Sequence, residues 1–351
     1  MTYDDIFARE SFPITSVETP GKNVVDSLLR SVGKLHYAVQ SGRRKWVITY
    51  SGGKDSTLLT VIACEVMRRN LDWRPNSIDI VYCDTLEEIP PMHQAALEFL
   101  NYIDTIASEE NLPINTHIAR PAPNETYWYL MLGKGYPAPH RSFWWCTERL
   151  KIKPVKRRLE ELNHQGESFA VLTGVRFGES DRRDGKMRRA SQCMGEGECG
   201  QVLEYQGALA PIAHWKTCQV WKCLAILTPS WGWPTLTVVD LYGDTPIRFG
   251  CWTCTLIERD QALDAVTQKP EWRHLSALAE FKQKIIDATA NRDARVMRPN
   301  GVPGKFKVAT KKRLLRELKE LEQETGLALI FPEEEKRIQR YWETDEKGDS
   351  Y

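Results

Sequence analysis

The fold is decided by the stretch KWVITYSGGKDSTLLTVIACEVMRRN at residues 45–70. Its first six residues are an apolar, β-branched run that is typical of a buried strand, and its last thirteen are an apolar helix. Between them lies SGGKDST at 51–57, where two glycines allow a tight turn and a close approach to a ligand. A helix that begins after such a turn offers unpaired N–H groups and a positive dipole end. The stretch therefore predicts an anion site at the first turn of the helix.

Strand and helix patterns alternate along the following 120 or so residues, which predicts an α/β fold with a parallel sheet. Apolar residues at helical spacing also predict a leading amphipathic helix at 23–41. Further strands are predicted at 78–85, 114–120 and 167–176, and helices at 90–110 and 151–163. Ligands of parallel sheets bind at the carboxyl ends of the strands. We therefore expect the site in the loops after Tyr50, Cys83 and Thr173.

Composition places the chain in the ordinary globular class. Of its 351 residues, 42% are hydrophobic and 27% are charged, so disordered, collagenous and coiled-coil classes are excluded. The net charge of +1 excludes no class of partner. No apolar run approaches the roughly 18–20 residues that span a bilayer, and the start MTYDDIFARE is acidic where a signal peptide is basic. We therefore predict a soluble, cytoplasmic protein without a membrane partner, whose nine cysteines are not disulfides.

Changes of pattern divide the sequence into four predicted regions. They are an N-terminal helical extension at 1–45, an α/β domain at 46–180, a Cys-rich region at 181–255 and a helical, basic region at 256–351. Residues 181–254 are rich in Gly, Cys and Trp and show little periodicity. The last region contains Leu314, Leu315, Leu318 and Leu321 on one helical face.

The glycine turn is not a Walker A loop, because its two glycines directly precede Lys54. It resembles the PP-loop signature SGGxDS of the ATP pyrophosphatases, and three more segments resemble the PAPS-reductase-like branch of that superfamily. These are DTLEE at 84–88, WCTERLKIKP at 145–154, and TGVR at 173–176 with Glu179, Ser180 and Arg183. RFGCWTCT at 248–255 is similar to a segment of the DndC-type and SspD-type sulfurtransferases of DNA phosphorothioation. The branch often has Arg where this chain has Trp144.

The resemblance, which covers about residues 46–256, implies a PP-loop fold of the adenine nucleotide alpha hydrolase type. It also implies an enzyme that converts ATP to AMP and pyrophosphate, adenylylates a DNA backbone phosphate and lets sulfur replace the adenylylated oxygen. A cysteine desulfurase and other phosphorothioation proteins are the implied partners. The expected catalytic residues are Lys54, Asp55 and Asp84. Expected ATP-binding residues are Ser51, Gly52, Gly53, Lys54, Asp55, Ser56, Thr57, Lys151, Gly174, Arg176 and Arg183.

Asp84 at a strand end is a candidate Mg²⁺ ligand, with a helix N-cap before Leu86 as the alternative. Cys251 and Cys254 have a metal-type spacing, and Cys193 and Cys199 supply a second pair. Four thiolates suit Zn²⁺ or a [4Fe–4S] cluster, and the resemblance favours the cluster. Cys146 is a candidate persulfide carrier, with a cluster ligand and a packed thiol as alternatives. The remaining cysteines, Cys64, Cys83, Cys218 and Cys223, are predicted to be core residues.

Two basic regions are candidate DNA contacts, or else ordinary solvated surface. One contains Arg182, Arg183, Lys186, Arg188 and Arg189, and the other contains Arg292, Arg295, Arg298, Lys305, Lys307, Lys311, Lys312, Arg313 and Arg316. Three other functions compete: a sulfonucleotide (PAPS or APS) reductase, a transfer-RNA thiolase, and a non-catalytic nucleotide- or DNA-binding subunit. The reductase is disfavoured because no Cys follows Cys254 and no two cysteines are adjacent.

Overall fold

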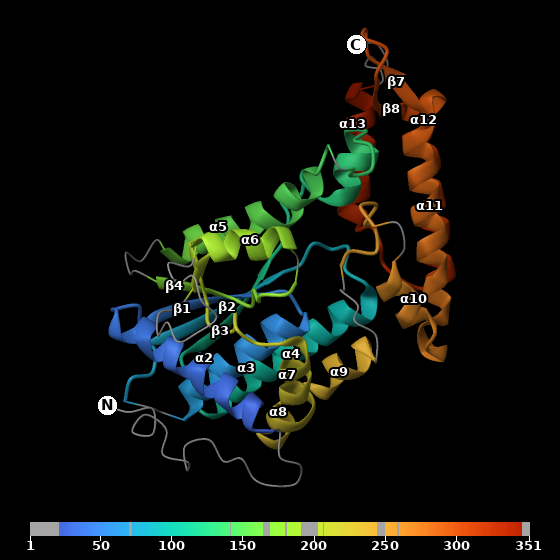
Figure 1. Ribbon diagram of the computed structural model, residues 1–351. Helices are drawn as coiled ribbons and strands as arrows, with labels where there is room; N and C mark the ends of the chain where they lie inside the picture. Colours follow the sequence, from blue (N-terminus) through green and yellow to red (C-terminus); the bar gives the residue numbers. More distant parts are fainter. Residues whose placement is uncertain are drawn as a thin grey trace. The chain divides into compact units, whose positions relative to one another are not determined.

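The computed structural model describes residues 21–69, 72–140, 142–163, 169–179, 181–190, 203–205, 207–243, 250–257 and 260–345 (Figure 1). The chain divides into two compact units. Unit 1 comprises Met1–Cys83, Met92–Ile118 and Arg158–Gly243, and unit 2 comprises Asp84–Pro91, Ala119–Arg157 and Asp244–Tyr351. Both units are built from segments that are separate in the sequence, whereas the four predicted regions are contiguous.

Unit 1 is organised around a mostly parallel sheet, as predicted. Its strands are β1 (Lys45–Tyr50), β2 (Ser77–Cys83), β3 (Ile114–Ala119), β4 (Phe169–Thr173), β5 (Leu203–Tyr205) and β6 (Ala208–Ala210), in the order β3-β2-β1-β4-β6-β5. β1 pairs in parallel with β2 and β4, so that Trp46 lies between Ile78 and Ala170. The four predicted strands are confirmed. The short antiparallel pair β5–β6 was not predicted.

The strand order places a switch of direction beside β1. After β1 the sheet grows through β2 to β3, and the chain then returns to pair β4 with the other side of β1. Loops that follow two strands on either side of such a switch diverge and leave room for a ligand between them. The turns after β1 and β4 therefore form the expected binding edge of the sheet.

Helices cover both faces of this sheet. They are α2 (Lys22–Gln40), α3 (Lys54–Arg68), α4 (Pro90–Glu109), α5 (Lys153–Asn163), α6 (Asp181–Ala190), α7 (Thr217–Lys222), α8 (Thr228–Ser230) and α9 (Leu236–Tyr242). Figure 1 shows α2, α3, α4 and α7 on one face and α5 and α6 on the other. The apolar α3 is buried without a break from Ser56 to Met67, because α2 covers its outer side and the sheet its inner side. The predicted helices at both ends of β1 are thus confirmed.

Unit 2 is mainly helical, which confirms a helical C-terminal region. Its elements are the π-helical turns η1 (Tyr129–Gly133) and η2 (Thr147–Ile152), then α10 (Gln261–Thr267), η4 (Pro270–Leu275), α11 (Ser276–Ala290), β7 (Arg295–Met297), β8 (Pro303–Phe306), α12 (Val308–Thr325) and α13 (Pro332–Asp345). The ring of Trp128 packs against Trp252 and Phe281 in its core. The four leucines predicted to share one helical face are all buried on α12.

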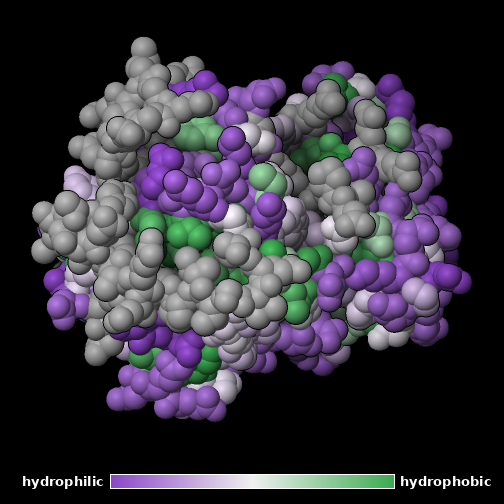
Figure 2. Space-filling view, turned by 60° about the horizontal axis from the view of Figure 1, so that its bottom comes forward, coloured by the Kyte–Doolittle hydropathy of each residue, from purple (hydrophilic) through white to green (hydrophobic). Residues whose placement is uncertain are grey.

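Several expectations from the sequence differ from the structure. Residues 181–254 showed little periodicity, yet they contain α6, α7 and α9, which are only 6–10 residues long and too short to show a repeat. Cys218 and Cys83 were both predicted to be core residues. Cys218 is exposed, because it lies in the first turn of α7 on the side away from Val220, and Cys83 is only partly buried, because it ends β2. No helix among the described residues is long and apolar enough to cross a bilayer, and hydrophilic residues cover much of the face shown in Figure 2.

Candidate nucleotide site

The turn between β1 and α3 has a conformation that requires glycine. Gly52 has a φ of 74°, a backbone angle that residues with a side chain rarely adopt. A Cβ at this position would lie 3.0 Å from the Cβ of Ala96. Gly53 follows in an extended conformation and directly precedes α3. The backbone thus makes a tight turn between the end of β1 and the start of α3.

Hydrogen bonds fix the shape of this turn while leaving part of its backbone open. The hydroxyls of Ser56 and Thr57 donate to the carbonyl of Gly53 at 2.9 and 3.0 Å, and the amide of Ser51 donates to Ser56 Oγ at 3.2 Å. The backbone N–H groups of Gly52, Gly53, Asp55 and Ser56 donate no hydrogen bond within the described part of the chain. The helix begins without a side-chain cap. These open donors lie at the positive end of the α3 dipole, where an anion is favoured.

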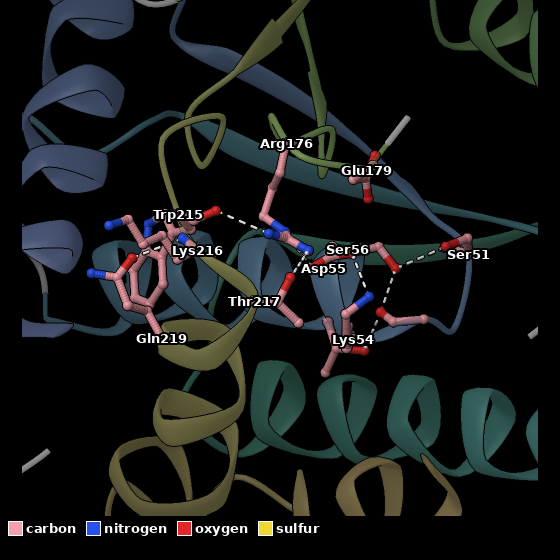
Figure 3. Close-up of polar contacts among 12 residues, drawn as sticks. Ser51, Lys54, Asp55, Ser56, Arg176, Glu179, Trp215, Lys216, Thr217 and Gln219 are labelled. Atoms are coloured by element: carbon pink, nitrogen blue, oxygen red, sulfur yellow. Dashed lines mark hydrogen bonds and ion pairs between the residues drawn. The ribbon is translucent and has the colours of Figure 1, made fainter. Parts of the chain in front are cut away.

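One carboxylate bridges two cations next to the turn (Figure 3). Asp55 Oδ2 lies 3.0 Å from Lys54 Nζ, and Asp55 Oδ1 lies 2.6 Å from Arg176 Nε. Arg176 is only 2% exposed, and its other nitrogens donate to the carbonyl of Trp215 at 2.9 Å and to Thr217 Oγ1 at 3.4 Å. Each of the three guanidinium nitrogens therefore has an acceptor inside unit 1. It holds Asp55 in place, and its predicted direct contact with ATP stays a prediction.

The end of β4 lies directly on the start of α3. A Cβ at Gly174 would be 2.9 Å from the Asp55 carbonyl carbon and from the Ser56 nitrogen. The absence of a side chain at Gly174 therefore lets the end of β4 pack against the first turn of α3. An ATP-binding role for Gly174 stays a prediction. The switch of direction beside β1 brings the two segments together.

Two aromatic rings that the sequence did not single out lie beside Lys54. Its ammonium is 5.9 Å from the ring centre of Trp221 and 5.7 Å from that of Tyr242. The two rings are packed edge to face at 4.8 Å, and the Lys54 amide donates to the Tyr242 hydroxyl at 3.5 Å. Cation–π contacts of this kind attract an ammonium group to the ring face. The rings come from α7 and α9, in the region without periodicity, so no sequence signal connected them to the turn.

The remaining residues of unit 1 that the sequence singled out follow Gly174, with Glu179 before α6 and Arg183 in the first turn of α6. Arg183 forms an ion pair of 2.5 Å with Glu179, and its side chain is 40% exposed. Ser180 lies outside the described residues. An ATP-binding role for Arg183 stays a prediction.

Asp84, which belongs to unit 2, is buried and holds a turn together. Its Oδ1 accepts the Leu86 amide at 3.0 Å, and its Oδ2 accepts Arg120 Nε at 2.8 Å. Leu86 has a φ of 70°, and the next helix begins only at Pro90. The alternative interpretation of Asp84 as a helix N-cap is therefore wrong, because Asp84 stabilises a tight turn before an extended segment. Its role as a Mg²⁺ ligand stays a prediction.

Unit 2 also gathers three thiols in one neighbourhood. Burial raises the pKa of Tyr127, and Glu87 and the thiols of Cys146, Cys251 and Cys254 raise it further. Burial likewise raises the pKa of Cys251 to about 12, an effect that the nearby Lys151 opposes. Cys146 was predicted as a ligand only as one of three alternatives, and here it adjoins the predicted pair. Among the described residues, no three cysteine sulfurs lie within 4.8 Å of one another. Cys193 and Cys199 lie outside the described residues.

Glu87 is a buried carboxyl beside this neighbourhood, and it yields a pH-dependent prediction. Burial raises its pKa well above the ordinary value, and the carboxylates of Glu334, Glu88 and Asp84 raise it further. Its Oε2 atom has no hydrogen-bond partner in the described part of the chain. Such a carboxyl binds its proton more tightly when folded. The stability it contributes is therefore complete below its unfolded pKa and is lost as pH rises through the folded pKa.

We therefore expect Glu87→Gln to be as stable as the parent near pH 4 and more stable near pH 8, because the amide cannot ionise. Urea unfolding at both pH values measures the difference. Glu333→Gln is the matched control, because Lys336 lowers the pKa of this exposed carboxyl. A parent protein that is more stable than Glu87→Gln near pH 8 would contradict the prediction.

Comparison with known proteins places this arrangement in a family. Residues 45–257 match the phosphoadenosine phosphosulfate reductase domain. Two uncharacterized proteins of Methanocaldococcus jannaschii are similar to the chain. One is 24% identical over 80% of this chain and 51% of its own length, and the other is 21% identical over 72% and 49%. The chain thus spans about half the length of the curated relatives it matches.

A solved structure, the phosphoadenylyl-sulfate (PAPS) reductase from Candida auris in a phosphate complex, is also similar. It is 20% identical, covers 70% of this chain and 100% of its own, and gives a TM-score of 0.38.

Proposed function

Because the chain belongs to the phosphoadenosine phosphosulfate reductase domain family, we propose that it is a PP-loop enzyme that binds ATP at the turn between β1 and α3. The observation that carries this proposal is the set of open amides at Gly52, Gly53, Asp55 and Ser56. Preorganised N–H donors of this kind stabilise negative charge as it develops on a departing phosphate group. The β- and γ-phosphates of ATP are the natural occupants, and they leave together as pyrophosphate.

In the proposed reaction, an oxygen of the acceptor attacks the α-phosphorus of ATP. The bond between the α-phosphorus and the bridging oxygen breaks, and its electron pair leaves with pyrophosphate. The Lys54 ammonium stands next to the turn and meets the increasing charge on the leaving group. Asp55 and Arg176 keep this ammonium in place. The acceptor now carries AMP, which is a good leaving group.

We infer that the acceptor is a backbone phosphate of DNA and that sulfur then displaces AMP to give a phosphorothioate. The support is the similarity of residues 248–255 to DNA phosphorothioation sulfurtransferases, together with the thiol neighbourhood of unit 2. A cysteine desulfurase would supply the sulfur as a persulfide on the candidate carrier Cys146. The outer sulfur attacks the phosphorus as AMP leaves, and a second thiol then attacks the Cys146 sulfur, so that the phosphorothioate is released and a disulfide between Cys146 and that thiol is formed. Burial raises the pKa of Cys146, so a nearby cation such as Lys151 would be needed to favour its thiolate.

The thiols of unit 2 also fit an iron–sulfur cluster, for which thiolates are the usual ligands. Cys146, Cys251 and Cys254 are the described residues that would hold it. A bound cluster would supply electron-transfer or structural chemistry. Anaerobic iron and sulfide analysis of the parent and of Cys251→Ala tests this assignment, and equal iron in both would remove Cys251 from the ligands.

The decisive experiment follows the products of ATP. We expect the purified chain to release AMP and pyrophosphate from ATP in the presence of Mg²⁺ and DNA. Lys54→Met should lower the rate by roughly 100-fold, the size of one lost electrostatic contact in a transition state. Lys22→Met, which removes an exposed lysine at the start of α2, is the matched control and should change nothing.

Two other outcomes would contradict this proposal. Release of ADP and phosphate would exclude attack at the α-phosphorus. Release of sulfite from phosphoadenylyl sulfate, with ATP left intact, would make the chain a sulfonucleotide reductase, which its family name also allows.

A further inference from the structure

The hairpin formed by β7 and β8 in unit 2 concentrates positive charge. Residues 292–307 contain five basic side chains and one acidic one, although the whole chain carries a net charge of only +1. The basic residues are Arg292, Arg295, Arg298, Lys305 and Lys307. A local concentration of this size in a nearly neutral chain is the electrostatic pattern of a polyanion contact.

Hydrogen bonds to backbone carbonyls hold the two strands of the hairpin together and make it a rigid element. The guanidinium of Arg295 donates to the carbonyls of Thr289, Pro303 and Gly304 at 2.6–3.0 Å, which ties the two strands to the end of α11. At the tip, the Arg298 amide donates to the Val302 carbonyl at 3.0 Å. A preformed element loses little conformational entropy when it binds, so the hairpin is suited to docking.

The tip exposes apolar and cationic side chains together. Met297 is 37% exposed and Val302 is 47% exposed, one on each side of the turn. Arg298 lies between them in the sequence, is exposed, and has no side-chain partner among the residues that the structure describes. An apolar tip flanked by arginine is the combination with which some proteins enter the minor groove of DNA and part a base step.

The first half of α12, which follows β8 directly and is hydrogen-bonded to Ala294 at the base of the hairpin, is also positively charged on its exposed side. Lys312, Arg313 and Arg316 lie in its first half, and the second half is acidic. The helix dipole favours acidic residues near the N-terminus and basic residues near the C-terminus, so the charges of α12 are in the unfavourable order. The ion pairs that follow, Arg313–Glu317 and Arg316–Glu320, are long at 3.9 Å and therefore compensate little. The arrangement costs stability in the free chain, and an anionic partner along this side would offset that cost.

We propose that the β7–β8 hairpin and the exposed first half of α12 form a docking surface for double-stranded DNA. The major groove of B-form DNA admits a two-stranded ribbon, and its minor groove accepts an apolar tip flanked by arginine. The deep major groove of A-form RNA is too narrow for side chains to read, and its minor groove is shallow. The hairpin tip enters the groove, and the cations of α12 contact the flanking phosphates. The inference rests on the proposal that DNA is the acceptor, but it concerns binding alone and needs no ATP.

The test uses the full chain and a 24-base-pair DNA duplex, with affinity measured by fluorescence anisotropy at several salt concentrations and without ATP. Arg298→Gln/Lys307→Gln should weaken binding on the order of tenfold and reduce the salt slope by about 2, because two phosphate contacts are lost. Lys336→Gln/Arg340→Gln is the matched control, because it removes two exposed charges from α13 of the same unit. It should bind like the parent.

Three results would overturn the inference. The hairpin variant binding DNA as tightly as the parent would exclude this surface. An equal or larger loss with a matched RNA duplex would assign the surface to RNA. A chain that forms AMP and pyrophosphate from ATP yet does not bind DNA would remove DNA as the partner while leaving the nucleotide site intact. Circular dichroism of each variant checks that the exposed substitutions leave the fold unchanged.

Discussion

Replacing Asp55 with Ala is expected to lower the free energy of unfolding by about 3–5 kcal/mol, the usual cost of leaving a buried charge without its partner. The side chains of Arg176 and Asp55 are only 3% and 13% exposed. The variant would keep the guanidinium in the interior and remove its counter-ion. Lys54 would lose its partner too, so the start of α3 should become less protected. Urea unfolding gives the energy, and hydrogen exchange of residues 45–68 shows whether the loss is local to the turn.

The control is an ion pair in the same unit with a different environment. Glu179→Ala releases Arg183, whose side chain is 40% exposed, so water can replace the lost carboxylate. Its expected cost is below about 1 kcal/mol. The double variant Asp55→Ala/Arg176→Met should recover part of the stability, because it removes the stranded charge. Equal losses for Asp55→Ala and Glu179→Ala would show that the Asp55–Arg176 pair is not the buried contact described above.

The second large effect is expected from Gly174→Ala. The new methyl group would lie 2.9 Å from two backbone atoms of α3, and backbone cannot rotate away as a side chain does. The end of β4 and the start of α3 must therefore separate, at a cost of about 1–3 kcal/mol from overpacking. Because this separation moves the open amides of the turn, we expect formation of AMP to fall by at least about 100-fold.

Gly185→Ala is the matched control. Gly185 lies within α6, and a Cβ there meets no atom within 4 Å. Alanine is favoured over glycine inside a helix by about 1 kcal/mol, so this variant should be equally or more stable and fully active. Thermal unfolding and the rate of AMP formation are measured for both variants. Full activity of Gly174→Ala would refute the role given to the meeting of β4 and α3.

The parts of the site that could be predicted are those encoded locally. A β-branched run, two glycines and an apolar helix follow one another within 26 residues, so the strand, the turn and the helix were evident. The strand pattern placed a site in the loop after Thr173, and the family resemblance singled out Gly174 and Arg176 within that loop. The partner of Arg176 was not predictable, because it lies 121 residues away and is chosen by the strand order. Trp221 and Tyr242 were missed for the same reason.

The thiols illustrate a different limit. Spacing joined Cys251 to Cys254, because two positions three residues apart lie close wherever the chain forms a turn, as it does here. Cys146 is 105 residues before Cys251 and has no such relation, and only the packing around Tyr127 brings it near. The division into discontinuous units could not be predicted either. The segments at 84–91 and 119–157 belong to unit 2, but no change in composition separates them from the strands and helices of unit 1 on either side.

The ties of the Arg176 guanidinium have a consequence for the order in which the protein matures on the ribosome. Its ligands are supplied at positions 55, 215 and 217, so they emerge from the exit tunnel at widely separated times. The ribosome adds about 5–20 residues per second, and domains fold while synthesis proceeds. Residue 217 is therefore made on the order of ten seconds after Asp55. During that interval the nascent turn lacks its clamp. A growing chain should therefore complete the hydrogen bonds of Arg176, and with them the proposed nucleotide site, only after residue 217 has left the tunnel.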